Sequence, residues 1–261
     1  MITSLQNPSV KNIVKLYKSS RERSKQHLFV IEGARELSLA LASNYSIDSV
    51  YVCREKFNKT RYPDVLTSIS ESIVFEISFP VFEKIAYREG SDGIVALAKP
   101  KSHQLSDIEL SKNPFFIILE SVEKPGNLGA VLRTADAAAV DAVIVCDPQT
   151  DLYNPNVIRS GVGGLFTVQT AVCSSEEALE WLQVNNINFY AAELNGSKQY
   201  NTVDYTKPSA IVMGTEADGL TDYWINNSTD RIKIPMKGKI DSLNVSVTTA
   251  VITFEAMRQR G

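Results

Sequence analysis

Polar side chains that could do chemistry gather in three loops of the sequence, of which the first two follow apolar runs. The first loop spans residues 123–134 and reads EKPGNLGAVLRT, with Asn127 between two glycines and Arg133 further along. We expect a helix to begin in this loop with Asn127 as its N-cap residue. A helix N-terminus with glycines and an arginine suits a phosphate or another polar oxygen. The residues alone equally allow a strand-to-helix turn that carries an exposed arginine.

The second loop, residues 214–220, reads GTEADGL and follows another apolar run. Its glycines, Gly214 and Gly219, allow the backbone to approach a ligand closely. A carboxylate such as Glu216 at this place can bind a hydroxyl or an ammonium group, or orient an arginine. Taken alone, the loop would by default be a plain turn that carries solvated acids.

The third loop, residues 234–246, reads IPMKGKIDSLNVS and leads into the last helical stretch of the chain. We expect Asp241 or Ser242 to cap that helix, with Asn244 and Ser246 supplying an amide and a hydroxyl just inside it. The alternative is that these polar residues merely compete for backbone hydrogen bonds near the start of the helix.

The second half of the chain contains near-continuous apolar runs, which are typical of strands covered on both faces. These runs are 115–119, 142–146, 189–194 and 210–213, and helical periodicity lies at 128–139, 156–162, 176–185 and 242–260. The alternation predicts an α/β domain with a buried parallel sheet. Because ligands of such sheets usually bind at the carboxyl ends of the strands, the loops that follow these runs are the first place where a site is expected.

The first hundred residues predict a smaller α/β unit with a largely parallel sheet. Apolar residues at helical spacing indicate a helix over 8–18, and alternating elements follow it. Strand-like runs lie at 27–31, 49–53, 72–77 and 93–98, and helical patterns lie at 34–42, 63–70 and 79–88. We therefore divide the chain into a domain over 1–100, a polar linker over 101–113 and a second domain over 114–261.

The charge of the chain is unevenly distributed, although its 27 Lys and Arg nearly balance its 30 Asp and Glu. Residues 1–30 hold six cations and one anion, a net +5, and residues 231–261 hold six and two, a net +4. Residues 106–230 hold six cations and 17 anions, a net −11. Two basic ends around an acidic middle predict a local face for a polyanion. The alternative is that these charges cover solvated helix faces.

The composition, with 44% hydrophobic residues, is that of an ordinary soluble globular protein. No apolar run approaches the roughly 20 residues of a membrane span, so we expect no membrane association. Three separated cysteines, Cys53, Cys146 and Cys173, suggest reduced thiols and a cytoplasmic protein. Two histidines and no CxxC pair leave almost nothing for a zinc site, so we expect no metal.

In this order, the three loops resemble the three signature motifs of the SpoU/TrmH family of RNA ribose 2′-O-methyltransferases. The matching stretches are 127–135, 214–220, 234–236 with 242–246, and the ending 254–260. Each motif is weak alone, but all three at these separations are specific, and the resemblance covers about 115–261. The N-terminal unit, with residues 29–33 and the helix after them, more loosely resembles the ribosomal-protein-like RNA-binding domain at the front of many members.

This resemblance implies a parallel α/β domain whose C-terminal chain threads a deep trefoil knot, whereas the rarity of knots alone favours an unknotted, doubly wound sheet. It also implies a homodimer that binds S-adenosylmethionine. Carried over by motif, Gly214, Ile234 and Leu243 would contact the cofactor, and Leu194 at an earlier strand end is a further candidate.

The same motifs place Asn127, Arg133, Glu216, Ser242 and Asn244 in the catalytic and RNA-facing cluster. The family arginine, here Arg133, is often assigned the deprotonation of the ribose hydroxyl. Because the pKa of a guanidinium exceeds about 12, binding a phosphate or stabilising a developing alkoxide is physically easier for it.

We therefore expect a cytoplasmic, S-adenosylmethionine-dependent RNA 2′-O-methyltransferase. We favour rRNA over tRNA as its substrate because of the N-terminal RNA-binding unit, in which Arg21, Arg23 and Lys25 are the candidate RNA contacts. The rival is a non-catalytic RNA-binding protein on the same fold, against which the intact set of motif residues argues. An oxidoreductase fails as a third alternative, since the glycine cluster at 160–165 lacks the dinucleotide-binding spacing and the preceding strand.

Overall fold

The computed structural model describes residues 1–58, 60–87, 90–195 and 198–261. The chain forms two compact units, which are described separately. Met1–Lys101 and Asp151–Thr167 make up the N-terminal unit, and Ser102–Thr150 and Val168–Gly261 make up the C-terminal unit. We expected one domain over 114–261, whereas the structure places Asp151–Thr167 with the N-terminal residues.

The N-terminal unit contains a four-stranded sheet in the order β1-β4-β2-β3. The strands are β1 (Phe29–Glu32), β2 (Ile47–Val52), β3 (Val74–Glu76) and β4 (Ile94–Ala98). Strand β4 runs antiparallel to both β1 and β2, and only β2 and β3 are parallel. The expected largely parallel sheet is therefore wrong. A strand buried on both faces reads as the same apolar run in either direction, so the pattern could not reveal the orientation of β4.

The helices of this unit surround its sheet. They are α1 (Pro8–Lys18), α2 (Ser20–Gln26), α3 (Ala34–Ala42), α4 (Phe79–Ile85), α6 (Pro155–Ser160) and α7 (Gly164–Thr167), with a short 3₁₀ turn η1 (Glu71–Ile73). The expected helices over 8–18 and 34–42 are confirmed. The third, over 79–88, ends at Ile85, and residue 88 lies outside the described residues.

No helix forms over 63–70, where the prediction was wrong and the structure has turns. The hydroxyls of Thr67 and Ser68 donate to the carbonyl oxygen of Asp64, at 3.0 and 2.8 Å. Such side-chain bonds offer the backbone an alternative to helical pairing, which explains why the apolar spacing did not produce a helix.

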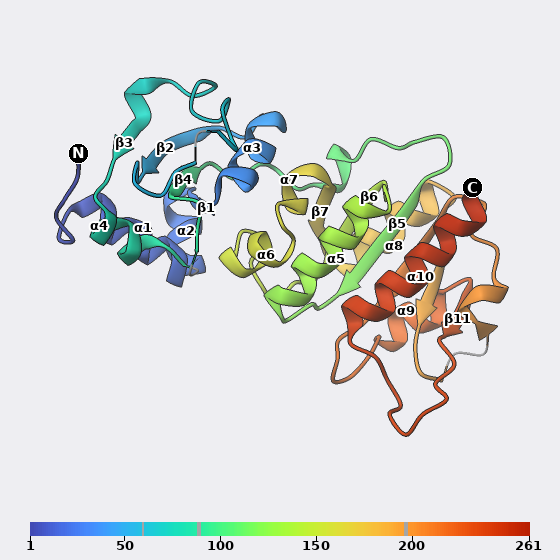
Figure 1. Ribbon diagram of the computed structural model, residues 1–261. Coiled ribbons are helices and arrows are strands. Elements are labelled where there is room, and N and C mark those ends of the chain that lie inside the picture. Colours follow the sequence, from blue (N-terminus) through green and yellow to red (C-terminus); the bar gives the residue numbers. More distant parts are fainter. Residues whose placement is uncertain (59, 88–89, 196–197) are drawn as a thin grey trace. The chain divides into compact units, whose positions relative to one another are not determined.

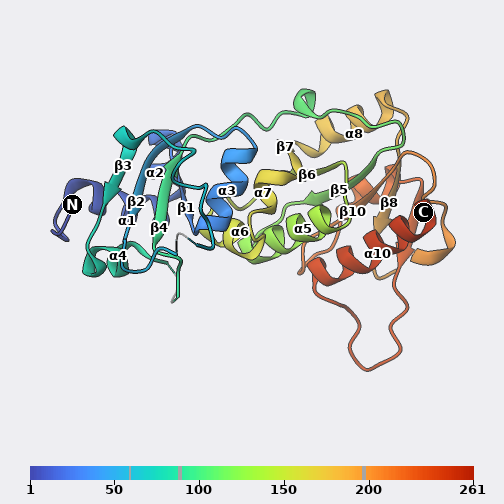
Figure 2. The same ribbon diagram turned by 45° about the horizontal axis from the view of Figure 1, so that its top comes forward.

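Residues 151–167 complete the core of the N-terminal unit, with α6 beside β1 and α7 beside α3 (Figure 2). The ring of Phe29 lies 4.2 Å from that of Tyr153 and 6.2 Å from that of Phe166, measured between centroids. All three rings are buried. Two stretches of chain far apart in the sequence therefore share one aromatic core.

The C-terminal unit is built on a seven-stranded sheet in the order β7-β6-β5-β10-β8-β11-β9, in which every pairing is parallel. The strands are β5 (Phe115–Glu120), β6 (Ala142–Cys146), β7 (Gln169–Cys173), β8 (Asn188–Ala192), β9 (Lys198–Gln199), β10 (Ser209–Met213) and β11 (Asp230–Lys233). The four expected strands and the parallel sheet are confirmed. Strands β7, β9 and β11 were not predicted, because their sequences are short and partly polar.

Helices cover both faces of this sheet (Figure 1). They are α5 (Pro125–Ala137), α8 (Ser175–Val184), α9 (Asp222–Asn227) and α10 (Val245–Arg260), with 3₁₀ turns η2 (Leu105–Asp107) and η3 (Tyr200–Thr202). Residues of α8 and Trp224 of α9 share one buried cluster with Phe116 and Ile118 of β5. Helices α5 and α10 lie side by side on the other face.

No helix in the described ranges is long and apolar enough to cross a membrane. Within the same ranges, His, Cys, Asp and Glu side chains form no group of three that could hold a metal ion.

Candidate functional site

Three neighbouring strands of the C-terminal sheet end in register, and their loops begin at one edge. Ala192 of β8 pairs with Met213 of β10 and with Ile232 of β11. Two cofactor candidates, Leu194 and Ile234, are each two residues beyond those partners, and Gly214 is one residue beyond Met213. The structure therefore brings all three to the carboxyl edge of the sheet, where the parallel arrangement predicted a ligand site.

Helix α5 begins three residues before the expected position. Its N-cap residue is Lys124 and Pro125 is its first helical residue, so the prediction of Asn127 as N-cap is wrong. Proline is favoured at this position because its fixed φ suits a helix and its missing N–H group is not needed there. Asn127 lies in the first turn of the helix, and its side-chain amide is available for contacts with another loop.

Helix α10 begins later than expected, at Val245, with Asn244 rather than Asp241 or Ser242 as its N-cap residue. Asn244 Oδ1 accepts a hydrogen bond from the backbone N–H of Ser246 at 3.0 Å and from its hydroxyl at 2.6 Å. The helix cap therefore uses the oxygen of the Asn244 amide and leaves its nitrogen directed elsewhere.

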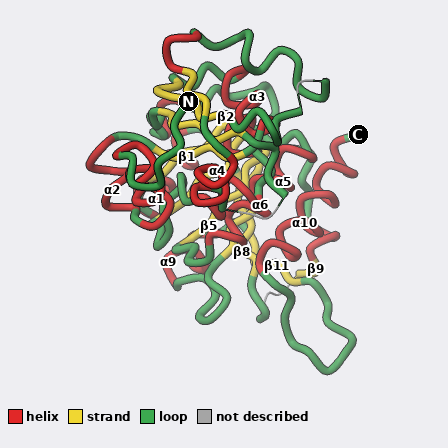
Figure 3. The backbone as a smooth tube through the Cα atoms, turned by 60° about the vertical axis from the view of Figure 1, so that its left-hand side comes forward, coloured by secondary structure: helices red, strands yellow, loops and turns green. Residues whose placement is uncertain are grey.

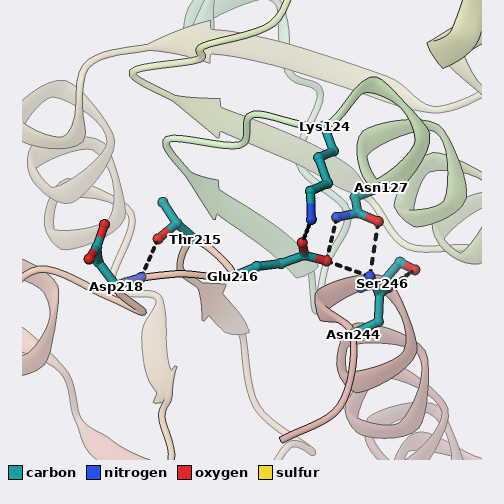
Figure 4. Close-up of polar contacts among 7 residues, drawn as sticks. All are labelled: Lys124, Asn127, Thr215, Glu216, Asp218, Asn244 and Ser246. Carbon is teal, nitrogen blue, oxygen red and sulfur yellow. Dashed lines mark hydrogen bonds and ion pairs between the residues drawn. The ribbon is translucent and has the colours of Figure 1, made fainter.

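Glu216 is the centre of a polar cluster to which all three loops contribute (Figure 4). Its Oε1 accepts from Asn127 Nδ2 at 2.9 Å and from Asn244 Nδ2 at 2.5 Å. Its Oε2 forms an ion pair with Lys124 Nζ. Asn244 Nδ2 also lies 3.2 Å from Asn127 Oδ1. We call Lys124, Asn127, Glu216 and Asn244 the polar cluster.

The second loop folds back on its own first glycine. The backbone N–H of Thr215 donates to Gly219 O at 3.0 Å, and that of Asp218 donates to Thr215 Oγ1 at 2.9 Å. A Cβ atom placed on Gly214 would overlap the backbone of Gly219 and Leu220. Gly214 is therefore needed for the shape of the loop itself, whereas the sequence suggested only close approach to a ligand.

Two residues that position the site were missed by sequence reasoning. Lys124 stands at the N-terminal end of a helix, where the helix dipole disfavours a cation, and this was an available signal for a nearby acid. Glu120, which ends β5, is buried and accepts from Thr221 N at 2.9 Å and Thr221 Oγ1 at 2.6 Å. These bonds fix the far end of the second loop. The sequence signal for Glu120 was an acidic residue at the end of an apolar strand.

Arg133 and Ser242 are not part of the polar cluster. Arg133 is exposed on α5, and no described side chain pairs with it. Ser242 is also exposed and donates to its neighbour Asp241 at 3.3 Å. Of the five expected catalytic residues, the structure thus groups Asn127, Glu216 and Asn244. It leaves the Arg133 guanidinium and the Ser242 hydroxyl open to solvent.

The three expected RNA contacts of the N-terminal unit do not share one environment. Arg21 and Lys25 are exposed on α2. Arg23 is 6% exposed, and its Nε forms an ion pair with Asp151 at 2.6 Å. Its Nη1 donates to the carbonyl oxygens of Leu16 and Tyr17. A buried and fully engaged guanidinium is not available to RNA phosphates, so Arg23 is removed from the candidate RNA contacts.

The loop between β11 and α10 offers a surface suited to a nucleoside-containing cofactor. It contains neither helix nor strand (Figure 3), and its backbone groups over 234–243 have no backbone partners among the described residues. Apolar side chains are nevertheless exposed here: Ile240 is 71% and Leu243 41% exposed, and Leu194 at the end of β8 is 61% exposed. Open main-chain groups beside exposed apolar side chains fit a ligand such as S-adenosylmethionine.

The fold and the polar cluster together define a class of protein. It is an α/β protein with a parallel sheet, in which loops that follow the strands meet at one carboxylate held by two amides and a lysine. Residues 114–254 match the SpoU rRNA Methylase family, and residues 7–96 match the MRM3-like substrate binding domain. The chain belongs to the SpoU rRNA Methylase family.

Individual relatives match nearly the whole chain. A crystal structure of an RNA 2′-O ribose methyltransferase is 36% identical with a TM-score of 0.88, covering 99% of this chain and 98% of that one. The AdoMet-bound rRNA methyltransferase of Sinorhizobium meliloti is 29% identical with a TM-score of 0.89, covering 98% and 97%. The 23S rRNA (guanosine(2553)-2'-O)-methyltransferase RlmP of Bacillus subtilis (strain 168) is 27% identical over 97% of each chain.

Proposed function

We propose that this protein transfers the methyl group of S-adenosylmethionine to a ribose 2′-hydroxyl of ribosomal RNA. The observation that carries the proposal is the polar cluster, which joins the three family motifs at the carboxyl edge of a parallel sheet. Relatives that match over 97% or more of this chain are described as RNA or rRNA methyltransferases.

The cofactor is held by the loops after β8, β10 and β11. Leu194, Gly214, Ile234 and Leu243 are its contacts in this proposal, with exposed apolar side chains against the nucleoside and backbone groups of 234–243 for hydrogen bonds. S-adenosylmethionine supplies an electrophilic methyl group on a sulfonium, and this chemistry needs no metal.

Positioning accounts for much of the reaction. The ribose 2′-oxygen forms a bond to the methyl carbon as the carbon–sulfur bond breaks and its electron pair stays on sulfur, and the hydroxyl proton passes to solvent water. Arg133, exposed and without a protein partner among the described residues, binds a phosphate next to the target ribose or stabilises charge on that oxygen. Ser242 is a further exposed hydroxyl for the RNA.

Glu216 acts as a positioning residue in this scheme. Three donors from two other loops converge on its carboxylate, which fixes the start of α5 against the start of α10.

The N-terminal unit captures the RNA substrate, with Arg21 and Lys25 as exposed cations on α2. Its match to a substrate binding domain supports this assignment. The domains of the proposal are the RNA-binding residues 1–100, a linker over 101–113 and the methyltransferase residues 114–261, with 151–167 serving the fold of the first.

We propose further that the protein is a cytoplasmic homodimer whose C-terminal chain forms the family's trefoil knot. Val247 and Phe254 of α10 are 47% and 51% exposed and seven residues apart, so they share one helix face that a second copy can cover. Sedimentation equilibrium tests the dimer, and Phe254→Glu is expected to produce monomers. Pulling the chain by its ends tests the knot, because a knotted chain stops short of its full extended length.

The deciding experiment is methyl transfer to rRNA from a strain that lacks this gene. The purified protein, given labelled S-adenosylmethionine, is expected to place the label on one ribose, which nuclease digestion and mass spectrometry identify. Label on a base would contradict the ribose assignment, and binding of rRNA without any transfer would favour the non-catalytic rival. Label on tRNA alone would show that the substrate is tRNA rather than rRNA.

Arg133→Ala tests the role of the exposed arginine. We expect unchanged affinity for S-adenosylmethionine and a loss of about 10²–10³ in kcat, the size of losing one preorganised donor at a developing anion. Arg35→Ala, which removes an exposed arginine of the N-terminal unit, is the matched control. Calorimetry and methyl transfer separate the two steps, and loss of cofactor binding in folded Arg133→Ala would contradict the role.

A further inference from the structure

A cleft in the N-terminal unit is lined by two stacked tyrosines and an arginine. Tyr17 lies on α1, Tyr87 follows α4 and Arg159 lies on α6. The two tyrosine rings are 5.6 Å apart between centroids and tilted by 16°, and the Arg159 guanidinium lies 5.5 Å from the Tyr87 centroid. The remaining lining residues of the cleft are Val30, Glu32, Pro155 and Ile158. We call Tyr17, Tyr87 and Arg159 the stacking array.

Glu32 fixes the stacking array in place. Its Oε2 accepts from the Tyr17 hydroxyl at 2.9 Å and from the backbone N–H of Tyr87 at 2.8 Å. The Tyr17 ring is therefore oriented by its hydroxyl, and the backbone of Tyr87 is held where its ring stacks on Tyr17, which lowers the entropy cost of binding a planar ligand.

The array remains open to solvent although it is ordered. Tyr87 is 45% exposed, and Arg159 is exposed on α6. Exposed lysines stand beside the tyrosines in the sequence: Lys18 directly follows Tyr17, and Lys84 lies in the last turn of α4. The surface thus combines aromatic rings with a guanidinium, and two exposed lysines lie close to the tyrosines in the sequence.

These are the features with which proteins bind single-stranded nucleic acid. Unstacked bases lie against aromatic rings and guanidinium planes, while neighbouring cations follow the phosphates. Another exposed aromatic ring of the same unit lacks them: Phe75 is 41% exposed and stacks on Tyr51 at 5.6 Å, but no described cation lies over it and it does not line the cleft.

We propose that the stacking array binds an unpaired base of the RNA substrate. The inference rests on the proposed function for the identity of the substrate and deepens it by naming the contact. It assigns a binding role to Arg159, which lies in the inserted segment 151–167 and outside residues 7–96.

The test measures affinity for a single-stranded RNA of about 12 nucleotides by fluorescence anisotropy, with the full-length protein. We expect Tyr87→Ala to weaken binding about 5- to 100-fold, the range reported by alanine substitution at stacked bases. Phe75→Ala is the matched control and should stay within about twofold, since it removes an exposed ring of similar exposure. Equal losses in the two variants, or no loss in Tyr87→Ala, would overturn the proposal.

Salt dependence separates stacking from charge. Tyr87→Ala should leave the slope of log K against log salt unchanged, whereas Arg159→Gln should reduce it by about 0.7, the value for one phosphate contact on a single strand. The same measurement with an RNA duplex of equal length is the control. If Tyr87→Ala weakened binding of the duplex as much as binding of the single strand, Tyr87 would contact the RNA backbone and base stacking would be wrong.

Two further measurements test the proposal if Tyr87→Ala does not fold or if the protein does not methylate RNA. If Tyr87→Ala does not fold, Tyr87→Trp retains a ring, and its fluorescence should be quenched by the single-stranded RNA; absence of quenching would refute the array. Methyl transfer with an unchanged KM for RNA in Tyr87→Ala would also refute it and leave the proposed function intact. Conversely, weakened RNA binding in a protein that methylates nothing would support the array and refute the function.

Discussion

Two ion pairs of this protein, Arg23–Asp151 in the N-terminal unit and Lys124–Glu216 in the C-terminal unit, have opposite surroundings. In the N-terminal unit, the side chains of Arg23 and Asp151 are 6% and 25% exposed. In the C-terminal unit, those of Lys124 and Glu216 are 64% and 28% exposed. The first pair lies in the core of its unit, and the second lies at an open edge of a sheet.

Burial determines what each pair contributes. Arg23 also donates to Leu16 O at 2.5 Å and Tyr17 O at 3.3 Å, so its removal would leave Asp151 and two carbonyl groups without their donor. Breaking a buried pair costs several kcal/mol, whereas exposed pairs are worth about 0–1 kcal/mol. We infer that the Arg23 pair holds the inserted segment to its unit and that the Lys124 pair orients loops for a ligand.

Gly214→Val should show the largest effect and should affect binding rather than folding. The added side chain would collide with the backbone of Gly219 and Leu220 and displace the second loop, including Glu216. We expect the affinity for S-adenosylmethionine to fall at least about 100-fold by calorimetry, while circular dichroism stays native. Gly126→Ala is the control, because a Cβ there meets nothing within 4 Å. Unchanged affinity in Gly214→Val would remove this loop from the site.

Arg23→Met should have the opposite signature in the N-terminal unit. We expect the free energy of unfolding to fall by about 2–3 kcal/mol, at the lower end for a buried pair because Asp151 keeps a quarter of its surface in water. Chemical denaturation measures it.

Arg21→Ala, two residues away and exposed, is the matched variant. It should change stability by less than about 0.5 kcal/mol and should reduce the salt dependence of RNA binding. If Arg21→Ala destabilised the protein as much as Arg23→Met, the contrast between buried and exposed cations would be wrong.

The difference in burial between Arg21 and Arg23 could not be predicted from the sequence. Arg21, Arg23 and Lys25 lie within two turns of one helix, and all three read as surface cations. The partner of Arg23 is 128 residues away, in a segment whose own sequence predicts only a short helix. No local pattern distinguishes the buried cation, because its burial depends on which distant segment packs there.

The site was easier to predict than the N-terminal unit, for a geometric reason. Parallel strands place their carboxyl ends at one edge, so loops that follow such strands converge without any knowledge of long-range packing. That argument placed Gly214 at this edge, whereas Ile234 was expected in the site only from the family resemblance, because β11 was not predicted. It could not fix the helix starts, where Pro125 and Asn244 were decisive, and it gave no reason to pair Lys124 with Glu216.

Glu255→Gln should have the smallest effect on stability, and it tests whether exposed ion pairs contribute little to the free energy of unfolding. Glu255 accepts two hydrogen bonds from Arg258, both at 2.8 Å, and one from Gln259, which together lower its pKa from 4.5 to about 2. Because the pKa is lower in the folded protein, the ionised carboxylate stabilises the fold above about pH 4.5. That contribution is lost as the pH falls toward 2.

Arg258 is 70% exposed, so solvent screens the pair and its contribution to stability at pH 7 should be small despite the low pKa of Glu255. Unfolding free energies of the wild type and Glu255→Gln, measured from pH 7 down to pH 3, should differ slightly at neutral pH and converge as the solution is acidified. A loss at pH 7 as large as that of Arg23→Met would show that exposure does not govern the strength of these pairs, and the contrast between the two units would need another cause.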